Sequence, residues 1–398
     1  MKARILLLIW AVLVAVMPAF AQESVLGNNL TDDCVTEFDP ETDYFPEKVD
    51  VNDAANFSVE YFNNYKLVTV TGSTETYTYA LVQCGTPAPE GDALPEDAQI
   101  VEVPAGGIVT LSTTYLPGLA ALGLVDNLVG MDSFLYTSTP EVLERIEAGD
   151  VIEVAPAFEL NTELVLATEP GLVMTDDYDP GRITQLVDLG IVAAVNTDYL
   201  EQTPLGRAEW LKYIALFYNA EATAEEIFSE IASAYEEVTD LAASVPEEER
   251  PVVLWNSYST FAEAWSIPGS ETYSGYLIED AGGIIALGAE AGSGSALLSF
   301  ESVYDGALDA DIWVPGLFAI NSLEDILALD ARYEDFIAVQ NSEVWNYDLD
   351  VNANGGNNFF ELGVLAPHLV LQDLVAIFHP DLLPDHEFTF FRRVEPAE

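Results

Sequence analysis

Basic residues are the scarcest feature of this 398-residue chain. It contains 12 Lys and Arg residues against 68 Asp and Glu residues, which gives a formal net charge of −56 at pH 7. Such a charge repels nucleic acids and anionic membrane surfaces, so both are excluded as partners. An acid-coated surface that keeps the protein soluble explains the excess, and attraction of a cationic ligand or a basic docking partner is the alternative.

Long apolar runs are also scarce. Beyond the start of the chain, no apolar run reaches the roughly eighteen residues that a membrane helix needs. The first residues combine Lys2 and Arg4 with an apolar run over 5–17 and a small-x-small triplet that ends at Ala21. This pattern predicts a secretory signal peptide over residues 1–21, cleaved after Ala21, and a retained anchor is the alternative. We therefore expect an exported protein of the periplasm or cell surface.

Cysteine is also rare, with only Cys34 and Cys84 in the whole chain. An oxidising compartment outside the cytoplasm favours a disulfide between them, and two free structural thiols are the alternative. Two cysteines are too few for a thiolate metal site.

Signatures of catalysis are missing as well. The three histidines, His368, His379 and His386, lie near the C-terminus at spacings that match no zinc motif. The chain has no G-x-S-x-G elbow and no phosphate-binding loop. In so acidic a chain, a pair of carboxylates is weak evidence for a catalytic site. We expect no enzyme, and a secreted hydrolase acting on glycans or peptides is the alternative.

Strand and helix patterns divide the mature chain into four regions. Residues 22–98 form an extension in which KLVTVTGSTETYTYALVQ predicts a β-hairpin. Residues 99–202 and 246–398 alternate strand and helix patterns, which is typical of parallel, doubly wound sheets. Residues 203–245 predict a helical linker whose second helix starts at a capping box on Thr223. The predicted fold class is α/β, with two lobes joined by a long helical spine.

One structural unit occurs in each lobe. NTELVLATEPGLVM and SFESVYDGALDADIWV both read as a polar turn with a Glu, a short helix, a loop and a strand. The Glu residues at matching positions are Glu163 and Glu301.

In this order, these segments resemble the substrate-binding proteins of ATP-driven importers for ferric siderophores, haem and cobalamin. The resemblance runs from about residue 100 to residue 393. Besides the two repeated units, it rests on PLGRAEWLKYIALFYNAEATAEEIF, YLIEDAGG and NNFFELGVLAPHLVLQDLVAIFHPDLLP. It implies a monomer without a cofactor of its own, which holds an iron chelate, haem or cobalamin between two lobes and docks on an ABC permease.

The resemblance also suggests roles for the paired glutamates. By position, Glu163 and Glu301 correspond to the residues with which the family contacts arginines on the permease. Two carboxylates on rigid helix starts can orient a basic partner. The alternative is that each one only stabilises the N-terminus of its own helix.

Candidate ligand contacts follow from the rule that ligands bind beyond the carboxyl ends of strands in open α/β sheets. Aromatic faces suit a porphyrin, a corrin or a catecholate, and tyrosine hydroxyls can bind ferric iron or a chelator. Arg182 is the best placed cation for an anionic chelator, with an ordinary salt bridge as the alternative. The predicted contacts are Thr113, Thr114, Tyr115, Asp132, Ser133, Asp177, Tyr178, Arg182, Trp255, Tyr258, Trp265, Asn357, Asn358 and Glu361.

The segment 350–361 also matches a calcium-binding loop. Its matching residues are Asp350, Asn352, Asn354, Gly355 and Glu361. The flanks disagree, because a strand pattern precedes it and Asn357 stands where an apolar residue belongs. We therefore expect no metal there but a loop that contributes pocket groups, and a calcium-stabilised binding module is the alternative.

Overall fold

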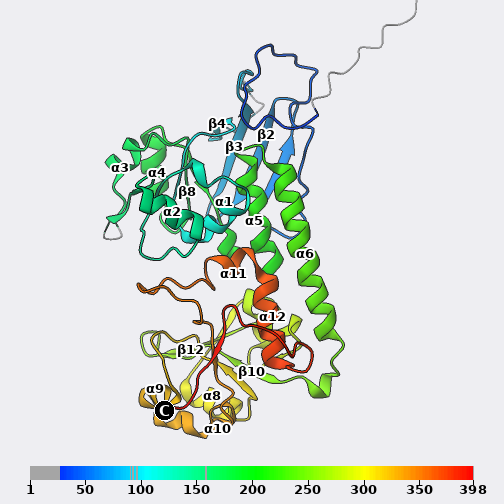
Figure 1. The fold of residues 1–398 in the computed structure, drawn as a ribbon, viewed down its shortest axis with the longest axis vertical. Coiled ribbons are helices and arrows are strands. Elements are labelled where there is room, and N and C mark those ends of the chain that lie inside the picture. Colours follow the sequence, from blue (N-terminus) through cyan, green and yellow to red (C-terminus); the bar gives the residue numbers. More distant parts are fainter. Residues whose placement is uncertain (1–26, 90, 92–93, 96, 157–158, 398) are drawn as a thin grey trace, which may run out of the picture.

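The computed structural model describes residues 27–89, 91, 94–95, 97–156 and 159–397. The predicted signal peptide lies outside these described residues. Figure 1 shows two lobes stacked along the long axis of the molecule, with the N-terminal extension at the free end of the first lobe. None of the helices in this part of the chain is long and apolar enough to cross a membrane.

The N-terminal extension is built around a four-stranded sheet in the order β1-β2-β3-β4. Its strands are β1 (Phe57–Tyr61), β2 (Tyr65–Thr71), β3 (Thr76–Gln83) and β4 (Gln99–Val103). β2 and β3 form the antiparallel hairpin that their alternating pattern predicted, whereas β4 runs parallel to β3. Cys34 and Cys84 form a disulfide, which fastens the segment before β1 to the end of β3.

The extension covers the edge of the sheet in the first lobe. The side-chain amide of Gln99 donates to the carbonyl of Ala193 and accepts from the N–H of the same residue, as a neighbouring strand would. The Tyr79 hydroxyl donates to this carbonyl and accepts from the N–H of Val195. Because these bonds satisfy backbone groups of an edge strand, the extension is an integral part of the lobe.

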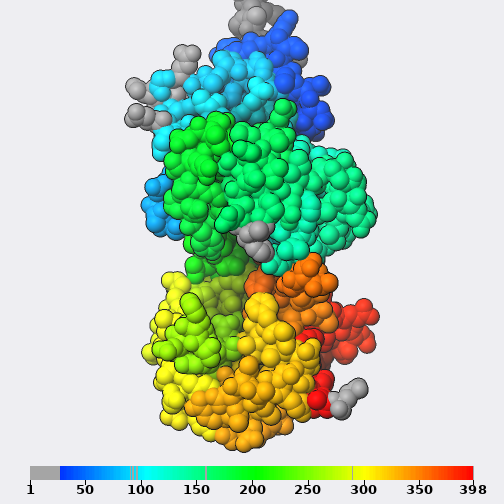
Figure 2. Space-filling model, turned by 90° about the vertical axis from the view of Figure 1, so that its left-hand side faces the viewer, coloured from blue at the N-terminus to red at the C-terminus, as the bar shows by residue number. Residues whose placement is uncertain are grey.

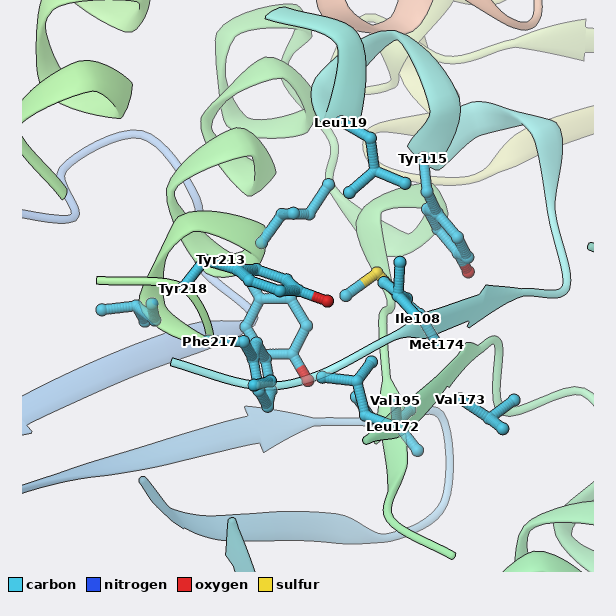
Figure 3. Close-up of a cluster of buried hydrophobic side chains, with 14 of the residues drawn as sticks. Ile108, Tyr115, Leu119, Leu172, Val173, Met174, Val195, Tyr213, Phe217 and Tyr218 are labelled. Carbon is cyan, nitrogen blue, oxygen red and sulfur yellow. The ribbon is translucent and has the colours of Figure 1, made fainter. Parts of the chain in front are cut away.

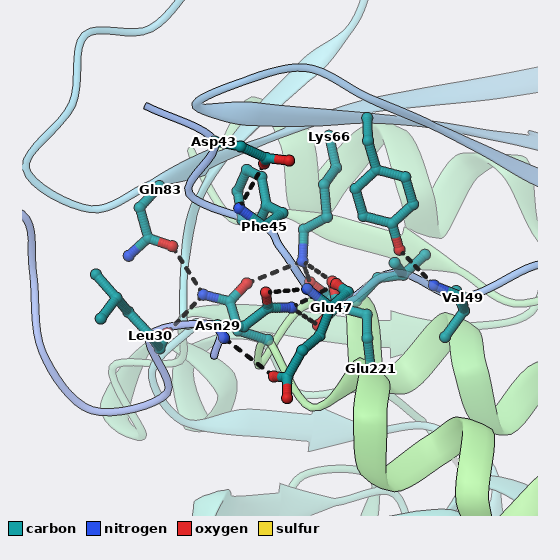
Figure 4. Close-up of polar contacts among 12 residues, drawn as sticks. Asn29, Leu30, Asp43, Phe45, Glu47, Val49, Lys66, Gln83 and Glu221 are labelled. Carbon is teal, nitrogen blue, oxygen red and sulfur yellow. Dashed lines mark hydrogen bonds and ion pairs between the residues drawn. The ribbon is translucent and has the colours of Figure 1, made fainter. Parts of the chain in front are cut away.

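A buried ion pair joins the extension to the helical spine (Figure 4). Lys66 on β2 donates to the carboxylate of Glu221 over 2.7 Å, and both side chains are fully buried. The same ammonium donates to the carbonyl of Leu216 and to the side chain of Asn219. The Asn29 amide donates to the second carboxylate oxygen of Glu221. Both charges are thus fully hydrogen-bonded, which is the condition under which burying them is tolerated.

The first lobe contains a five-stranded parallel sheet in the doubly wound order β7-β6-β5-β8-β9. Its strands are β5 (Ile108–Thr110), β6 (Leu128–Met131), β7 (Ile152–Glu153), β8 (Leu172–Thr175) and β9 (Ala193–Val195). The helices between them are α1 (Leu116–Ala121), α2 (Pro140–Ala148), α3 (Thr162–Ala167) and α4 (Pro180–Asp188). Figure 3 shows Ile108, Leu172 and Val195 of this sheet packed beside Tyr213 and Phe217 of the spine.

The spine consists of α5 (Pro204–Leu216) and the 23-residue helix α6 (Glu221–Ala243). α5 is buried on nearly all sides within the first lobe, whereas α6 runs along one side of the molecule to the second lobe (Figure 1). α6 starts two residues before the predicted capping box, so that prediction is wrong. The helix start is fixed by the buried pair of Glu221 with Lys66, and Thr223 lies inside the first turn.

The second lobe contains three small sheets among the described residues. A parallel sheet in the order β13-β10-β15 contains β10 (Val252–Trp255), β13 (Ile284–Ile285) and β15 (Ile312–Val314). An antiparallel sheet in the order β11-β12-β14 contains β11 (Tyr258–Ser259), β12 (Ala264–Pro268) and β14 (Ser295–Leu298). β16 (Trp345–Asn346) pairs with β17 (Arg392–Arg393). The sequence did not predict the antiparallel sheet, because its short strands interrupt a βα pattern.

The helices of the second lobe complete the predicted α/β class. They are α7 (Tyr273–Asp280), α8 (Phe300–Ala307), α9 (Leu323–Leu329), α10 (Ile337–Gln340), α11 (Leu362–Leu365) and α12 (Pro367–Phe378). α12 packs along α6, and α11 packs against α5, so the last helices return to the spine. The prediction of an α/β fold with two lobes and a long connecting helix is confirmed.

Candidate functional site

A cavity of about 330 Å³ lies where the two lobes meet. Figure 2 shows the lobes in contact, with the orange segment near residues 350–360 between them. The spine side of the cavity is lined by Glu201, Gln202 and Arg207. The second lobe contributes Trp255, Asn256, Pro268, Thr272, Tyr273, Ser274, Ser295, Tyr347, Phe359, Phe360 and Val364. The cavity therefore lies at the carboxyl end of β10, where the strand-end rule places a ligand.

Four aromatic side chains form one wall of this cavity. Trp255 ends β10, and Tyr347 stacks on it with ring centroids 6.3 Å apart. Phe359 stacks on Tyr347 at 4.5 Å, and Phe360 meets Tyr347 edge to face at 5.6 Å. Gly316 makes room for this wall, because a Cβ there would lie 2.2 Å from the Tyr347 hydroxyl. We call these four residues the aromatic wall.

Arg207 of α5 supplies a cation to the cavity lining. Its Nε donates to the carbonyl of Glu201 over 3.2 Å, and its Nη2 donates to the carbonyl of Tyr199 over 3.1 Å. The guanidinium lies 4.1 Å from the centre of the Tyr273 ring. Two carbonyls and a ring face thus hold the group in place without neutralising its charge.

The lack of a carboxylate partner sets Arg207 apart from most other cations. Ten Lys and Arg side chains fall within the described residues, and eight of them form ion pairs with carboxylates. The remaining two are Arg207 and Arg250. Arg250 precedes β10 and so lies at the opposite end of that strand from the cavity. In this part of the chain, Arg207 is thus the cation that lines the cavity and stays available to an anionic ligand.

Arg207 acts on the charge of Asp198, a buried residue of the loop before α5. Burial raises the pKa of Asp198 to about 6, against the opposing effect of Arg207. Asp198 and Arg207 both line a second, much smaller cavity, together with Thr114 and Tyr115. The charge on Asp198 therefore changes with pH in the neighbourhood of the ligand cavity.

The residues predicted after β5 lie beside this smaller cavity. Thr113, Thr114 and Tyr115 form a single 3-10 turn directly after the strand. Thr114 shares a hydrogen bond with Ser112, and both threonines are half-buried. Tyr115 belongs to the core (Figure 3), and burial raises its pKa well above the ordinary value. None of the three lines the 330 Å³ cavity.

The residues predicted after β6 lie outside the cavity lining. The Ser133 hydroxyl donates to Glu153 at the end of β7. Asp132 is half-buried, and burial raises the pKa of its carboxyl despite the nearby Arg182. Arg182 is ion-paired with Asp176 over 2.7 Å, which is the salt-bridge alternative considered for it.

Asp177 and Tyr178 follow β8 and have different environments. The Asp177 carboxylate accepts from Ser73 of the extension and from the Tyr199 hydroxyl. Burial opposes ionisation there, but these bonds prevail and hold the pKa of Asp177 below its usual value. Tyr178 is 72% exposed and stacks on Tyr199 with centroids 4.4 Å apart. Asp177 therefore connects the extension to the lobe, and Tyr178 offers an aromatic face to solvent.

The three aromatic residues predicted in the second lobe have three different positions. Trp255 lines the cavity. Tyr258 lies on β11, packs edge to face on Phe300, and is not part of the cavity lining. Trp265 is fully buried between Trp313 and other core rings, and its indole donates to the carbonyl of Trp255. The prediction for Trp265 is corrected, because its strand belongs to the unforeseen antiparallel sheet and directs the ring into the core.

Asn357 and Asn358 brace their own loop. The Asn357 amide donates to the carbonyl of Tyr347, and the Asn358 amide donates to Asp350. Neither asparagine lines the cavity, although the neighbouring Phe359 and Phe360 do.

Glu361 is not a ligand contact, because its carboxylate is buried against loop 137–139 of the first lobe. Thr139, the residue before α2, donates its hydroxyl to Glu361 rather than to the backbone of its own helix. Asp350 and Glu361 thus have different partners, and the described residues contain no cluster of three or more His, Cys, Asp and Glu that could hold a metal.

Glu163 and Glu301 occupy equivalent places in the two lobes. Each lies in the first turn of a short helix, α3 or α8, that leads into a parallel strand. Asn161 caps α3 and Ser299 caps α8 with their side chains. Glu163 is exposed, and Glu301 is exposed with Arg332 at 3.4 Å. The two units therefore share their local structure, and both carboxylates reach the surface.

Several residues of the cavity were missed by sequence reasoning. Arg207, Tyr273, Tyr347, Phe359 and Phe360 do not directly follow the parallel strands on which the strand-end rule operates. The scarcity of cations was the signal that could have identified Arg207, because each arginine in so acidic a chain needs an explanation.

Comparisons with known proteins agree with this architecture. A family model described as periplasmic binding protein matches residues 108–351. An uncharacterized lipoprotein of Methanocaldococcus jannaschii is 25% identical over 323 residues, which are 75% of this chain and 71% of the relative. A second uncharacterized lipoprotein of the same organism is 23% identical over 313 residues, which are 75% of this chain and 76% of the relative.

Solved structures share the fold at low sequence identity. A possible iron-binding, periplasmic solute-binding protein from Staphylococcus epidermidis has a TM-score of 0.55 at 15% identity and covers 69% of this chain and 99% of its own. CeuE of Helicobacter pylori has a TM-score of 0.55 at 16% identity and covers 80% of this chain and 90% of its own. The periplasmic heme-binding protein RhuT from Roseiflexus has a TM-score of 0.52 at 18% identity and covers 70% of this chain and 99% of its own.

Proposed function

The chain belongs to the periplasmic binding protein family, and we propose that it captures an iron chelate or a related tetrapyrrole between its lobes and delivers it to an ABC permease. Ferric siderophores, haem and cobalamin are the ligand classes considered. Because the family consists of binding proteins rather than enzymes, the hydrolase alternative is set aside.

The observation that carries the proposal is that Arg207, from the helical spine, lines the same cavity as the aromatic wall of the second lobe. A guanidinium without a carboxylate partner attracts an anionic group, and in a partly desolvated cavity this attraction is stronger than in water. The aromatic wall contributes ring surface to the cavity lining, which favours a flat, conjugated ligand. Haem satisfies both requirements with its planar ring and peripheral carboxylates, and a ferric catecholate siderophore satisfies them with its planar aromatic rings and negative charge.

Replacing Arg207 tests this proposal. Arg207→Gln removes the charge, and Arg250→Gln is the matched control because Arg250 also lacks a carboxylate partner but lies outside the cavity lining. A charge-assisted hydrogen bond contributes about 1.5–3 kcal/mol, so the Kd should rise roughly 10- to 100-fold in Arg207→Gln only. Binding of ferric siderophores, haem and cobalamin is followed by tryptophan fluorescence, since Trp255 lines the cavity. Equal affinities in both variants, or no binding to any of these ligands, would reject the proposed ligand class.

We also propose that Glu163 and Glu301 contact basic residues on the permease. Their exposure and their equivalent places in the two lobes support this role. The double variant Glu163→Arg/Glu301→Arg should reduce uptake in cells while ligand affinity stays unchanged. Glu144→Arg/Glu237→Arg makes the same charge change at exposed sites on α2 and α6 and serves as control. Equal uptake in the two double variants would exclude the docking role.

Export and a monomeric state complete the proposal. The mature protein should begin after Ala21, which the intact mass of the secreted protein measures directly. Sedimentation should give the mass of one chain, and a stable dimer would contradict a monomeric carrier.

A further inference from the structure

The segment 347–361 crosses from the second lobe to the first, and we call it the strap. It leaves the second lobe after β16 and ends where α11 begins. Figure 1 shows it as the orange segment between the lobes, beside α11. The Asn352 amide donates to the carbonyls of Leu135 and Thr137, both over 3.1 Å. Gly356 lies so close to the first lobe that a Cβ there would be 2.2 Å from the carbonyl oxygen of Tyr136.

Glu361 makes the strongest contact of the strap with the first lobe. Its carboxylate accepts hydrogen bonds from the N–H of Ser138 at 3.0 Å and from the N–H of Thr139 at 2.8 Å. It also accepts from the hydroxyls of Thr137 and Thr139. The side chain is 1% exposed. Hydrogen bonds to a charged acceptor are about twice as strong as neutral ones, so one side chain holds the two lobes together at this point.

The strap also carries three residues of the aromatic wall, which are Tyr347, Phe359 and Phe360. Asn357 donates to the carbonyl of Tyr347 and accepts from the N–H of Phe359, which fixes the turn that presents Phe359 and Phe360. Both phenylalanines line the ligand cavity, and Glu361 follows them directly in the chain. Glu361 is therefore the contact with the first lobe that lies next to these two phenylalanines in the chain, whereas Phe359 also packs on Phe390 and Phe391 of the second lobe.

We infer that Glu361 is a positioning residue that holds the strap against the first lobe and thereby limits the size of the ligand that the cavity accepts. The inference rests on the proposed function, because it concerns the same cavity. At about 330 Å³ the cavity is at the lower end of the roughly 300–1,000 Å³ typical of ligand pockets. The strap occupies space between the lobes, so its release enlarges the cavity and admits bulkier complexes.

Three variants test this inference. Glu361→Ala removes all four hydrogen bonds, and Glu361→Gln keeps the shape but not the charge. Asp350→Asn is the matched control, since Asp350 is an exposed strap carboxylate that bonds only within the strap. Hydrogen exchange at the amides of Ser138 and Thr139 reports the contact without any ligand. The exchange rate of these amides should rise about tenfold or more in Glu361→Ala and by a smaller factor in Glu361→Gln. In Asp350→Asn the exchange rate should stay unchanged.

Ligand selection is measured with two probes, ferric dihydroxybenzoate as the compact one and cyanocobalamin as the bulky one. The affinity for the bulky probe relative to the compact one should rise about tenfold in Glu361→Ala, by less in Glu361→Gln, and stay constant in Asp350→Asn. Exchange rates equal to those of the control, or faster exchange with an unchanged affinity ratio, would overturn the inference. If the wild type binds neither probe, the proposed ligand class fails, and the exchange rates alone decide whether Glu361 positions the strap.

Discussion

Removing the ammonium of Lys66 should destabilise the whole protein, because this group joins the extension to the spine. In Lys66→Met, Glu221 would remain as a buried carboxylate with one hydrogen bond, from Asn29. The carbonyl of Leu216 and the side-chain oxygen of Asn219 would lose their donor as well. Breaking a buried pair from one side costs about 3–5 kcal/mol, and this is the expected loss in the free energy of unfolding.

Urea unfolding followed by circular dichroism measures this loss, and a double variant separates its causes. Lys66→Met/Glu221→Met replaces both charges by apolar groups, so most of the stability should return. The extension and the first lobe should unfold in one transition in all three proteins, since they share a core. A loss below about 1 kcal/mol in Lys66→Met, or a double variant that is no more stable than Lys66→Met, would refute this reasoning.

Three further predictions concern pH, the disulfide and salt. Burial raises the pKa of Asp198 from 3.8 to about 6, so the folded state keeps a proton that the unfolded chain releases, and stability falls as the pH rises through this window. Asp198→Asn lacks this effect, and its stability relative to wild type should increase by roughly 2 kcal/mol between pH 4 and pH 7 in urea titrations; a constant difference would contradict this. Cys34→Ser/Cys84→Ser removes a disulfide between residues with a sequence separation of 50, and the free energy of unfolding, measured by calorimetry, should fall by roughly 4 kcal/mol. A loss below about 1 kcal/mol would show that the loop is ordered without the bond. Of the described lysines only Lys48 reaches solvent, at 42% side-chain exposure. Raising NaCl from about 0.1 to about 1 M should therefore raise the Tm, because salt screens the repulsion between the acidic side chains. An unchanged Tm would exclude this repulsion as a major contribution to the stability of the protein.

The sequence predicted those parts of the fold that depend on local patterns. The βα alternation of residues 99–202 predicted the parallel sheet of the first lobe, because hydrophobic periodicity is a property of neighbouring residues. The start of α6 was misplaced, because it depends on Lys66, which is 155 positions from Glu221 along the chain. A capping pattern at Thr223 could not outweigh that buried contact.

The candidate site was less predictable for the same reason. The strand-end rule found Trp255, but Arg207 comes from a helix and Tyr347 from the strap, and only tertiary packing brings them together. The calcium-like pattern drew attention to Glu361, yet its partner Thr139 lies 222 residues earlier. The sequence identified Trp255 and Glu361 as candidates, whereas the role of each depends on the distant residues that it contacts.

Native mass spectrometry of the protein purified from its own host tests the central claim most directly. We predict a bound small molecule that contains a metal and a conjugated, anionic group, and that is lost when Arg207→Gln is purified in the same way. A wild-type protein that carries only a neutral, metal-free ligand, or an Arg207→Gln protein with the same occupancy as wild type, would contradict the proposed function.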